Sequence, residues 1–186
     1  IENNLISGTG ESYGAEFFLK KANGKLNGWI GYTLSWTTRK FPELNDGKEF
    51  YAKYDRRHDL SVVATYDLSS KWSFSAIFIY ATGSATTLPV GRYFIEQKVV
   101  NEYGDRNSFR LAPYHRLDLS ATYTRTKTKK IESSWVFSVY NAYSRQNPYF
   151  IYFENTGSIS NFTLDIKAKQ VSLFPIITSV AYNFKF

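Results

Sequence analysis

The feature that most constrains this chain is an alternation of apolar and polar residues over unusually long runs. Between Leu60 and Leu68 every second residue is apolar or aromatic, while Ser61, Thr65 and Asp67 fall in between. A period of two is the pattern of a β-strand with two chemically different faces. Runs of this kind predict seven strands, at about residues 12–22, 26–37, 59–68, 72–80, 117–124, 133–143 and 170–186. No long segment has the helical period, so we expect an all-β protein.

The length of these runs favours strands that cross a membrane. The runs cover between 8 and 17 residues, most of them 9 to 12, whereas strands of water-soluble domains usually have about five or six and membrane-barrel strands about 9 to 11. Aromatic residues make up 18% of the chain, and such rings favour strands and membrane–water interfaces. In the fourth run, Trp72 and Tyr80 bracket the apolar residues between them, as expected if rings sit at both headgroup levels.

Short and long connections alternate strictly between the predicted strands. The short ones are residues 22–25, 69–71 and 126–131, and the long ones are about 39–56, 82–114 and 144–169. Outer-membrane barrels carry short periplasmic turns on one rim and long extracellular loops on the other. We therefore expect an antiparallel up-and-down meander of about seven long strands that is a segment of a transmembrane β-barrel. Counting Tyr149–Glu154 as a further strand of the meander breaks this alternation.

Composition excludes several other classes. The longest apolar run is about six residues, 76–81, and a membrane-spanning helix needs about 20. There is no cysteine, hence no disulfide framework and no thiolate nucleophile or ligand. The net charge of +7 indicates anionic neighbours. Many of the cations lie between strands, as in Lys20-Lys21 and Arg39-Lys40, so the charge forms a rim and not a single stripe.

The carboxy-terminal residues form a separate motif. Val180, Tyr182, Phe184 and Phe186 occupy every second position and end on an aromatic residue. This pattern resembles the signal by which the assembly machinery of outer-membrane proteins recognises its clients. Pairing along a strand edge, with pockets for alternate side chains, is a physically reasonable way to read such a tail.

Five further stretches extend the resemblance to TonB-dependent outer-membrane receptors of the Bacteroidetes type, from about Gly10 to Phe186. These are residues 54–60 (YDRRHDL), 80–83 (YATG), 88–93 (LPVGRY), 113–120 (PYHRLDLS) and 139–143 (VYNAY). In that family a 22-stranded barrel is closed by an amino-terminal plug, which an inner-membrane partner pulls to import a bound ligand. The chain has no plug and only about seven predicted strands, which leaves two unpaired edges. We therefore expect it to be the last third of such a barrel.

The resemblance implies a transport component of the bacterial outer membrane, without enzymatic activity or a cofactor. Its expected partners are outer-membrane lipid and lipopolysaccharide, the plug and earlier barrel strands, TonB and the barrel assembly machinery. Nucleic acid is not expected, because the aromatic residues alternate with Ser, Thr and Asp while the cations lie at the strand ends. Two alternatives stay open: a small complete eight-stranded barrel with an adhesion or structural role, and a soluble β-sandwich binding module. The imported ligand, whether siderophore, glycan or similar, is not identified.

Two groups of candidate site residues follow from the pattern. By parity, Arg57, Asp59, Arg116 and Asp118 face the polar side, where they are predicted to form ion pairs that line a wet lumen. In the connection of residues 82–114, cations are mixed with aromatic rings, a combination that suits a ligand or lipopolysaccharide phosphates. The candidate contacts there are Arg92, Tyr93, Arg106 and Arg110. The alternative is a loop held in place by its own aromatic residues.

The two histidines are weak candidates for chemistry. His58 and His115 both start strands that run the same way, each with an aspartate nearby. Two histidines without a third ligand are poor support for a metal site, and no nucleophile motif accompanies them. We expect structural or interfacial roles for both.

Overall fold

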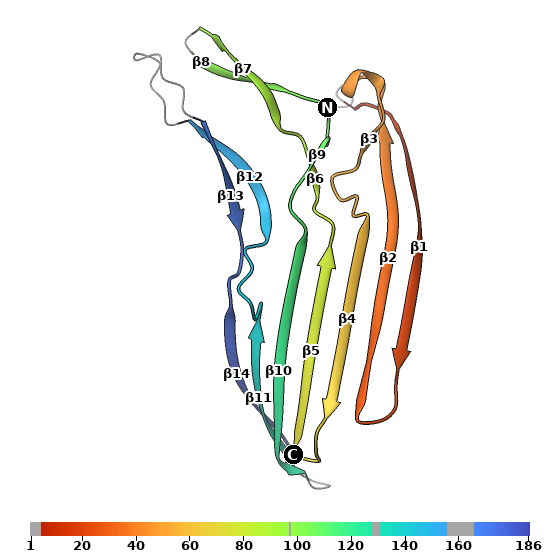
Figure 1. The fold of residues 1–186 in the computed structure, drawn as a ribbon, viewed down its shortest axis with the longest axis vertical. Helices are drawn as coiled ribbons and strands as arrows, with labels where there is room; N and C mark the ends of the chain where they lie inside the picture. The colour runs from red at the N-terminus through yellow and green to blue at the C-terminus, as the bar shows by residue number, and fades with distance from the viewer. Residues whose placement is uncertain (1–4, 97, 128–130, 156–165) are drawn as a thin grey trace.

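The computed structural model describes residues 5–96, 98–127, 131–155 and 166–186, and it shows an all-β chain. Seven long strands form one antiparallel meander in which each strand pairs with the next along the sheet (Figure 1). In sheet order they are β1 (Thr9–Lys21), β2 (Leu26–Lys40), β4 (His58–Asp67), β5 (Trp72–Ala81), β10 (Tyr114–Lys127), β11 (Glu132–Tyr140) and β14 (Ile177–Lys185). The predicted meander of about seven long strands is confirmed. Among the described strands, β1 and β14 each have a single neighbour, so the sheet is open.

The long and short connections lie at opposite ends of the sheet (Figure 1). We call these the long-loop end and the short-turn end; the carboxy terminus lies at the second. Gly24 in the β1–β2 turn has φ +97°, a left-handed conformation that glycine adopts without strain. Residues 128–130 of the predicted turn at 126–131, and residues 156–165 of the connection at 144–169, lie outside the described part of the chain.

The long connections contain strands of their own, which the alternation pattern did not predict. The first contains a 3-10 turn, Asn45–Gly47, and β3 (Phe50–Tyr51), which pairs with β2. In the second, β6 (Ala85–Thr86) pairs with β9 (Phe109–Arg110) and β7 (Pro89–Ile95) pairs with β8 (Lys98–Tyr103). In the third, β12 (Pro148–Asn155) pairs with β13 (Ile166–Ser172). Tyr149–Glu154 is thus a strand, but outside the meander, so the alternation of connection lengths is kept.

The seventh predicted strand, about 170–186, is longer than the strand in the structure. Residues 170–172 belong to β13 in the third connection, and the meander resumes only with β14 at Ile177. The interruption contains Phe174, with φ +54°, and Pro175. Proline has no N–H to donate to a neighbouring strand, so residue 175 does not continue a ladder from β13 into β14.

The register places apolar residues opposite one another across the whole sheet. Tyr66 pairs with Phe74, Phe74 with Ala121, Ala121 with Phe137, and Phe137 with Val180. The other face carries hydroxyl groups that are hydrogen bonded between strands, at 3.1 Å for Ser12–Thr37, 3.2 Å for Thr65–Ser75 and 2.7 Å for Ser138–Ser179. The sheet therefore has one apolar face and one polar face, as the period of two requires.

The buried core lies in the long connections and not on the apolar face. The buried apolar residues of the described chain are Phe50, Ala52, Ala81, Ala85 and Leu111. On the apolar face, Phe17, Leu119 and Val180 are 63%, 43% and 62% exposed. The substantial contacts between described elements all join strands of one ladder, so no second layer covers this face. No helix in the described ranges is long and apolar enough to cross a bilayer.

The location of the core predicts different responses to two leucine substitutions. Leu111→Ala removes a side chain that is 8% exposed, and such truncations cost about 2 kcal/mol or more. We expect the Ala85 and Leu111 amides, which donate to the Lys53 and Ser84 carbonyls, to exchange with deuterium about 30-fold faster. Leu119→Ala on the uncovered face is the control, and equal acceleration of both amides in the two variants would contradict this location of the core.

Candidate functional site

The candidate site lies at the long-loop end, where the three long connections meet the sheet (Figure 1). Three of the stretches that carry the family resemblance supply a central polar residue of this region: residues 54–60, 113–120 and 139–143. Each contributes one polar residue with several partners, namely Asp55, Arg116 and Asn141. We call them the three hub residues.

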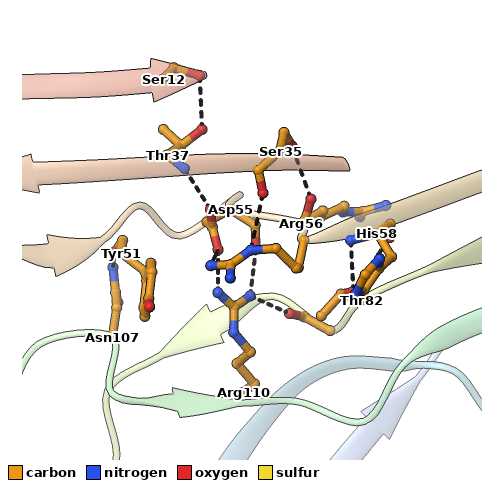
Figure 2. Close-up of polar contacts among 12 residues, drawn as sticks. Ser12, Ser35, Thr37, Tyr51, Asp55, Arg56, His58, Thr82, Asn107 and Arg110 are labelled. Atoms are coloured by element: carbon orange, nitrogen blue, oxygen red, sulfur yellow. Dashed lines mark hydrogen bonds and ion pairs between the residues drawn. The ribbon is translucent and has the colours of Figure 1, made fainter. Parts of the chain in front are cut away.

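Asp55 is the first hub, and its side chain is 0% exposed. One carboxylate oxygen accepts the backbone N–H of Thr37 on β2 at 2.6 Å. The other forms ion pairs with Arg57, at 3.7 Å, and with Arg110 from β9. Figure 2 shows the Asp55 carboxylate between Thr37 on β2 and Arg110. A buried carboxylate needs such compensation, because transfer of an unpaired charge out of water is costly.

Arg110 ties the second long connection to the first. Besides the Asp55 carboxylate it contacts the Asp55 carbonyl, at 2.7 Å, and the Gly83 carbonyl, at 3.4 Å (Figure 2). Its guanidinium carbon lies 4.9 Å from the ring centre of Tyr51, and that of Arg57 lies 5.5 Å from the same ring. A Cβ at Gly83 would collide with the Leu111 carbonyl, so glycine is needed for this close approach of the two backbones.

Further hydrogen bonds join the same two connections. Asn107 donates its side-chain amide to the Tyr51 carbonyl at 2.7 Å and, within the second connection, its backbone N–H to the Thr87 hydroxyl at 2.9 Å. The Arg106 backbone N–H donates to the Asn45 side chain at 2.6 Å. The first two long connections therefore form one hydrogen-bonded unit over the small buried core.

Arg116 is the second hub, on the polar face of β10. Its Nε donates to the Asp118 carboxylate at 2.9 Å, and its Nη1 lies 2.9 Å from the Tyr114 hydroxyl and 2.7 Å from the Tyr140 hydroxyl. The second oxygen of Asp118 accepts the backbone N–H of Asn141 at 2.9 Å. The guanidinium is thus fixed between two strands by a charge and two phenols.

Asn141 is the third hub and is 1% exposed. Its side-chain amide donates to the Arg145 and Phe174 carbonyls, at 2.9 and 3.1 Å, and accepts the Arg145 N–H at 3.0 Å. Its φ of +53° is one that asparagine tolerates better than most residues. Both ends of the third connection are held at this point.

Asn147 then replaces a missing strand neighbour. It accepts the His115 N–H and donates to the His115 carbonyl, each at 3.0 Å. This satisfies the backbone of β10 beyond the point where β11 ends.

The histidines are bonded to tyrosines at the apolar face. His58 Nδ1 lies 2.8 Å from the Tyr32 hydroxyl, and His115 Nδ1 lies 2.8 Å from the Tyr143 hydroxyl. Burial raises the pKa of Tyr143 above its usual value, so its hydroxyl stays neutral. Within the described ranges, no group of three or more His, Asp or Glu side chains is placed to hold a metal ion.

A cavity of about 600 Å³ opens between the first two connections and the third. Its walls combine cations with aromatic rings. The lining residues include Lys53, Tyr54, Arg56, Tyr114, Tyr140, Tyr149, Phe150 and Phe174. The walls come from all three long connections, and the hub residues hold those connections in place. Its chemistry suits a ligand with both a flat or apolar part and an anionic group.

The four predicted contacts of the second connection are not gathered into one surface. Arg110 is engaged by Asp55, and the Arg106 guanidinium lies 5.5 Å from the ring centre of Phe50. Arg92 on β7 donates to Asn101 at 2.7 Å and lies 5.1 Å from the ring of Phe153. Tyr93 is 47% exposed. Three of the four side chains thus make contacts within the protein, whereas their predicted role toward ligand or lipopolysaccharide stays a prediction.

The predicted charge pairs are arranged differently from one another. Arg116 and Asp118 are 2.9 Å apart. Arg57 instead pairs with Asp55, while Asp59 lies 3.9 Å from Arg56. The Arg57 guanidinium also lies 4.6 Å from the ring centre of Trp36, and the predicted role of these charges in lining a lumen stays a prediction.

The predicted assembly residues lie at the free edge of the sheet. Val180, Tyr182 and Phe184 are on the apolar face of β14 and are 62%, 45% and 56% exposed, and the terminal Phe186 is 94% exposed. Their role in assembly stays a prediction.

Asp55 and Asn141 are not among the predicted site residues, although both lie in stretches that carry the resemblance. A signal for Asp55 was present, since it is the one acid among Lys53, Arg56 and Arg57. An acid inside a run of cations is well placed to be shared by several of them.

Comparison of the chain with protein-family models, with curated proteins and with solved structures found no match.

The contacts of Asp55 predict that loss of its charge releases the second long connection from the first. Asp55→Asn removes the charge that Arg57 and Arg110 share, and breaking a buried pair costs about 3 kcal/mol. We expect trypsin to cleave after Arg110 about 100-fold faster, measured by mass spectrometry. Asp59→Asn is the matched control, because its exposed ion pair at 3.9 Å contributes less than about 1 kcal/mol. Equal cleavage rates in the two variants would argue against the tie.

The Asn147 bridge gives a second prediction. Asn147→Ala leaves the His115 N–H and carbonyl without their partner, at a cost of about 1–3 kcal/mol. The His115 amide should then exchange at least about 10-fold faster in an NMR exchange experiment. Gln146→Ala, which removes the neighbouring side chain, should leave that amide unchanged, and unaltered exchange in Asn147→Ala would refute the bridge.

Proposed function

We propose that this chain is part of the wall of a transmembrane β-barrel in a bacterial outer membrane, and that its long connections form external loops of a TonB-dependent import receptor. The proposal rests first on the apolar face, which runs from β1 to β14 without a covering layer. A sheet with one uncovered apolar face and one hydroxyl-rich face suits lipid on one side and water on the other.

Two rows of aromatic rings border the apolar face. At the short-turn end, the ring centres of Trp72 and Tyr123 are 4.9 Å apart, and those of Trp135 and Tyr182 are 4.8 Å apart. These four residues are register neighbours across β5, β10, β11 and β14. At the long-loop end, Tyr13 stacks on Trp36 at 5.4 Å, Tyr32 lies against His58, and Tyr80 pairs with His115. Amphipathic rings of this kind favour membrane–water interfaces.

The spacing of the two rows carries the proposal. Trp72 and Tyr80 are eight residues apart on β5, which corresponds to about 26 Å along a strand. The apolar band of outer-membrane barrels is about 25 Å tall. A strand tilt of about 40° would bring the ring centres to about 20 Å along the bilayer normal, with the rings extending into both headgroup regions.

Strand direction supports a wall segment within a larger barrel. Seven alternating strands leave β1 and β14 running the same way, from the long-loop end to the short-turn end. An antiparallel barrel therefore closes only with an odd number of further strands. This agrees with the even strand number of bacterial barrels and with the earlier strands that the resemblance implies.

The import role rests on the resemblance together with the long-loop end. The cavity of about 600 Å³ has walls from three connections that the hub residues hold in place, and such pre-ordering lowers the entropic cost of ligand binding. Gating by the plug and TonB, and recognition of the last strand by the assembly machinery, belong to the same proposal.

Depth-dependent quenching of tryptophan fluorescence tests the wall. Three variants each retain one of Trp29, Trp72 and Trp135, with the other tryptophans replaced by phenylalanine, and each is reconstituted in vesicles of brominated phosphatidylcholine. Trp72 and Trp135 should be quenched most strongly by bromine near the headgroups. Trp29, which pairs with Val63 on the polar face, should instead be quenched by aqueous iodide. Absence of lipid quenching at Trp72 and Trp135 would refute the proposal and favour a soluble module.

A further inference from the structure

The positive charge of this chain is concentrated at the short-turn end. The three short connections with their flanking residues (20–25, 67–71 and 125–132), together with Lys185, contain nine of the 23 basic residues and two of the 16 acidic ones. Their net charge of +7 equals that of the whole chain. The remaining 14 basic and 14 acidic residues cancel, and most of these lie toward the long-loop end. Lys127, Lys129 and Lys130 belong to this count by sequence alone, because their side chains are outside the described part of the chain.

The described cations at this end have no acidic partner. They are Lys20, Lys21, Lys25, Lys71, Arg125 and Lys185, all of them exposed, and we call them the basic rim. Even Lys185, which stands opposite Glu132 across the β11–β14 ladder, forms no ion pair within the described chain. At the long-loop end the ion pairs are numerous: Lys48–Asp105, Arg56–Asp59, Arg57–Asp55, Arg110–Asp55, Arg116–Asp118 and Lys169–Glu154. The basic rim is thus a set of uncompensated charges.

The basic rim lies directly beyond the row of aromatic rings at the short-turn end. Lys71 adjoins Trp72, Arg125 follows Tyr123 by two residues and Lys185 follows Tyr182 by three. At about 3.3 Å per residue these cations stand about 3 to 10 Å beyond the rings. Lysine and arginine have long apolar stems, so their charged groups reach the phosphate level of a bilayer whose interface the rings occupy.

We propose that the basic rim binds the headgroups of anionic phospholipids in the membrane leaflet at the short-turn end. The inference rests on the proposed membrane wall, because that wall sets the rim at headgroup level. A phosphodiester supplies the negative charge and the acceptor oxygens that the rim cations lack. Cations held within a Debye length of an anionic surface are attracted to it. The rim thereby fixes the depth of the wall and gathers anionic lipid around it.

Single-tryptophan reporters test this proposal. The Trp72 variant reports on the short-turn end and a Trp36 variant reports on the long-loop end. Each is reconstituted in phosphatidylcholine vesicles that contain a minor fraction of brominated lipid, either phosphatidylglycerol or phosphatidylcholine. At 0.1 M salt, we expect the anionic quencher to associate near Trp72 about fivefold more strongly than the neutral one, with no such preference at Trp36. The preference at Trp72 should be lost in about 1 M salt.

Two variants of equal net charge test which cations cause the preference for the anionic quencher at Trp72. The rim variant replaces Lys20, Lys21, Lys25 and Lys71 with glutamine, and the control replaces Arg39, Lys40, Lys48 and Lys169 with glutamine. The rim variant should lose the preference at Trp72, while the control should keep it. Equal quenching by the two lipids, or equal loss in both variants, overturns the proposal.

Failure of the rim proposal can be told apart from failure of the wall proposal. If Trp72 is quenched equally by both lipids, the wall stands and the rim proposal falls. If neither lipid quenches Trp72, the wall proposal fails as well. Protection of Lys71 from acetylation by soluble polyglutamate, but not by anionic vesicles, would assign the rim to an acidic protein and also overturn the proposal.

Discussion

Backbone hydrogen bonding along the meander forces every second side chain onto the same face, and on this face nearly all of them are apolar. In a water-soluble domain a second layer would cover that face, and each fully buried Val, Leu or Phe would contribute about 1.5–3 kcal/mol. Here Phe17, Leu119 and Val180 stay about half exposed or more. In the membrane wall that we propose, an apolar solvent takes the place of the missing layer.

Where the sheet meets its long connections, polar hub residues hold the chain segments together in place of a large apolar core. Asp55 and Asn141 are nearly inaccessible to water, and with Arg116 they hold segments that are distant in sequence. Hydrogen bonds and ion pairs are directional, so they specify one loop arrangement more strictly than apolar packing does. Each hub residue, however, depends on all of its partners being present. The loops are therefore ordered without a large apolar core, and a ligand would meet preformed cavity walls.

The strands were predictable from the sequence because the period of two is a local signal. The strand at 72–80 was located to within a residue, since Ser69-Ser70-Lys71 marks its start. The paired elements inside the long connections were not foreseen, because a ladder such as β12–β13 depends on contacts between residues 148–155 and 166–172. The last predicted strand also runs through Pro175, although a proline inside a run is a local signal that interrupts a strand. At the site, parity gave the face of Arg116 and Asp118 but not the sharing of Asp55 by Arg57 and Arg110, which are 53 residues apart.

The common direction of β1 and β14 also restricts how such sheets can meet. Copies held the same way up in one bilayer are related by rotation about its normal, which preserves strand direction. Any two of their free edges would then meet as parallel neighbours, out of keeping with the antiparallel bonding of the sheet. In the proposed membrane wall, a common orientation thus works against sideways self-assembly of identical chains and leaves both edges to strands of opposite direction.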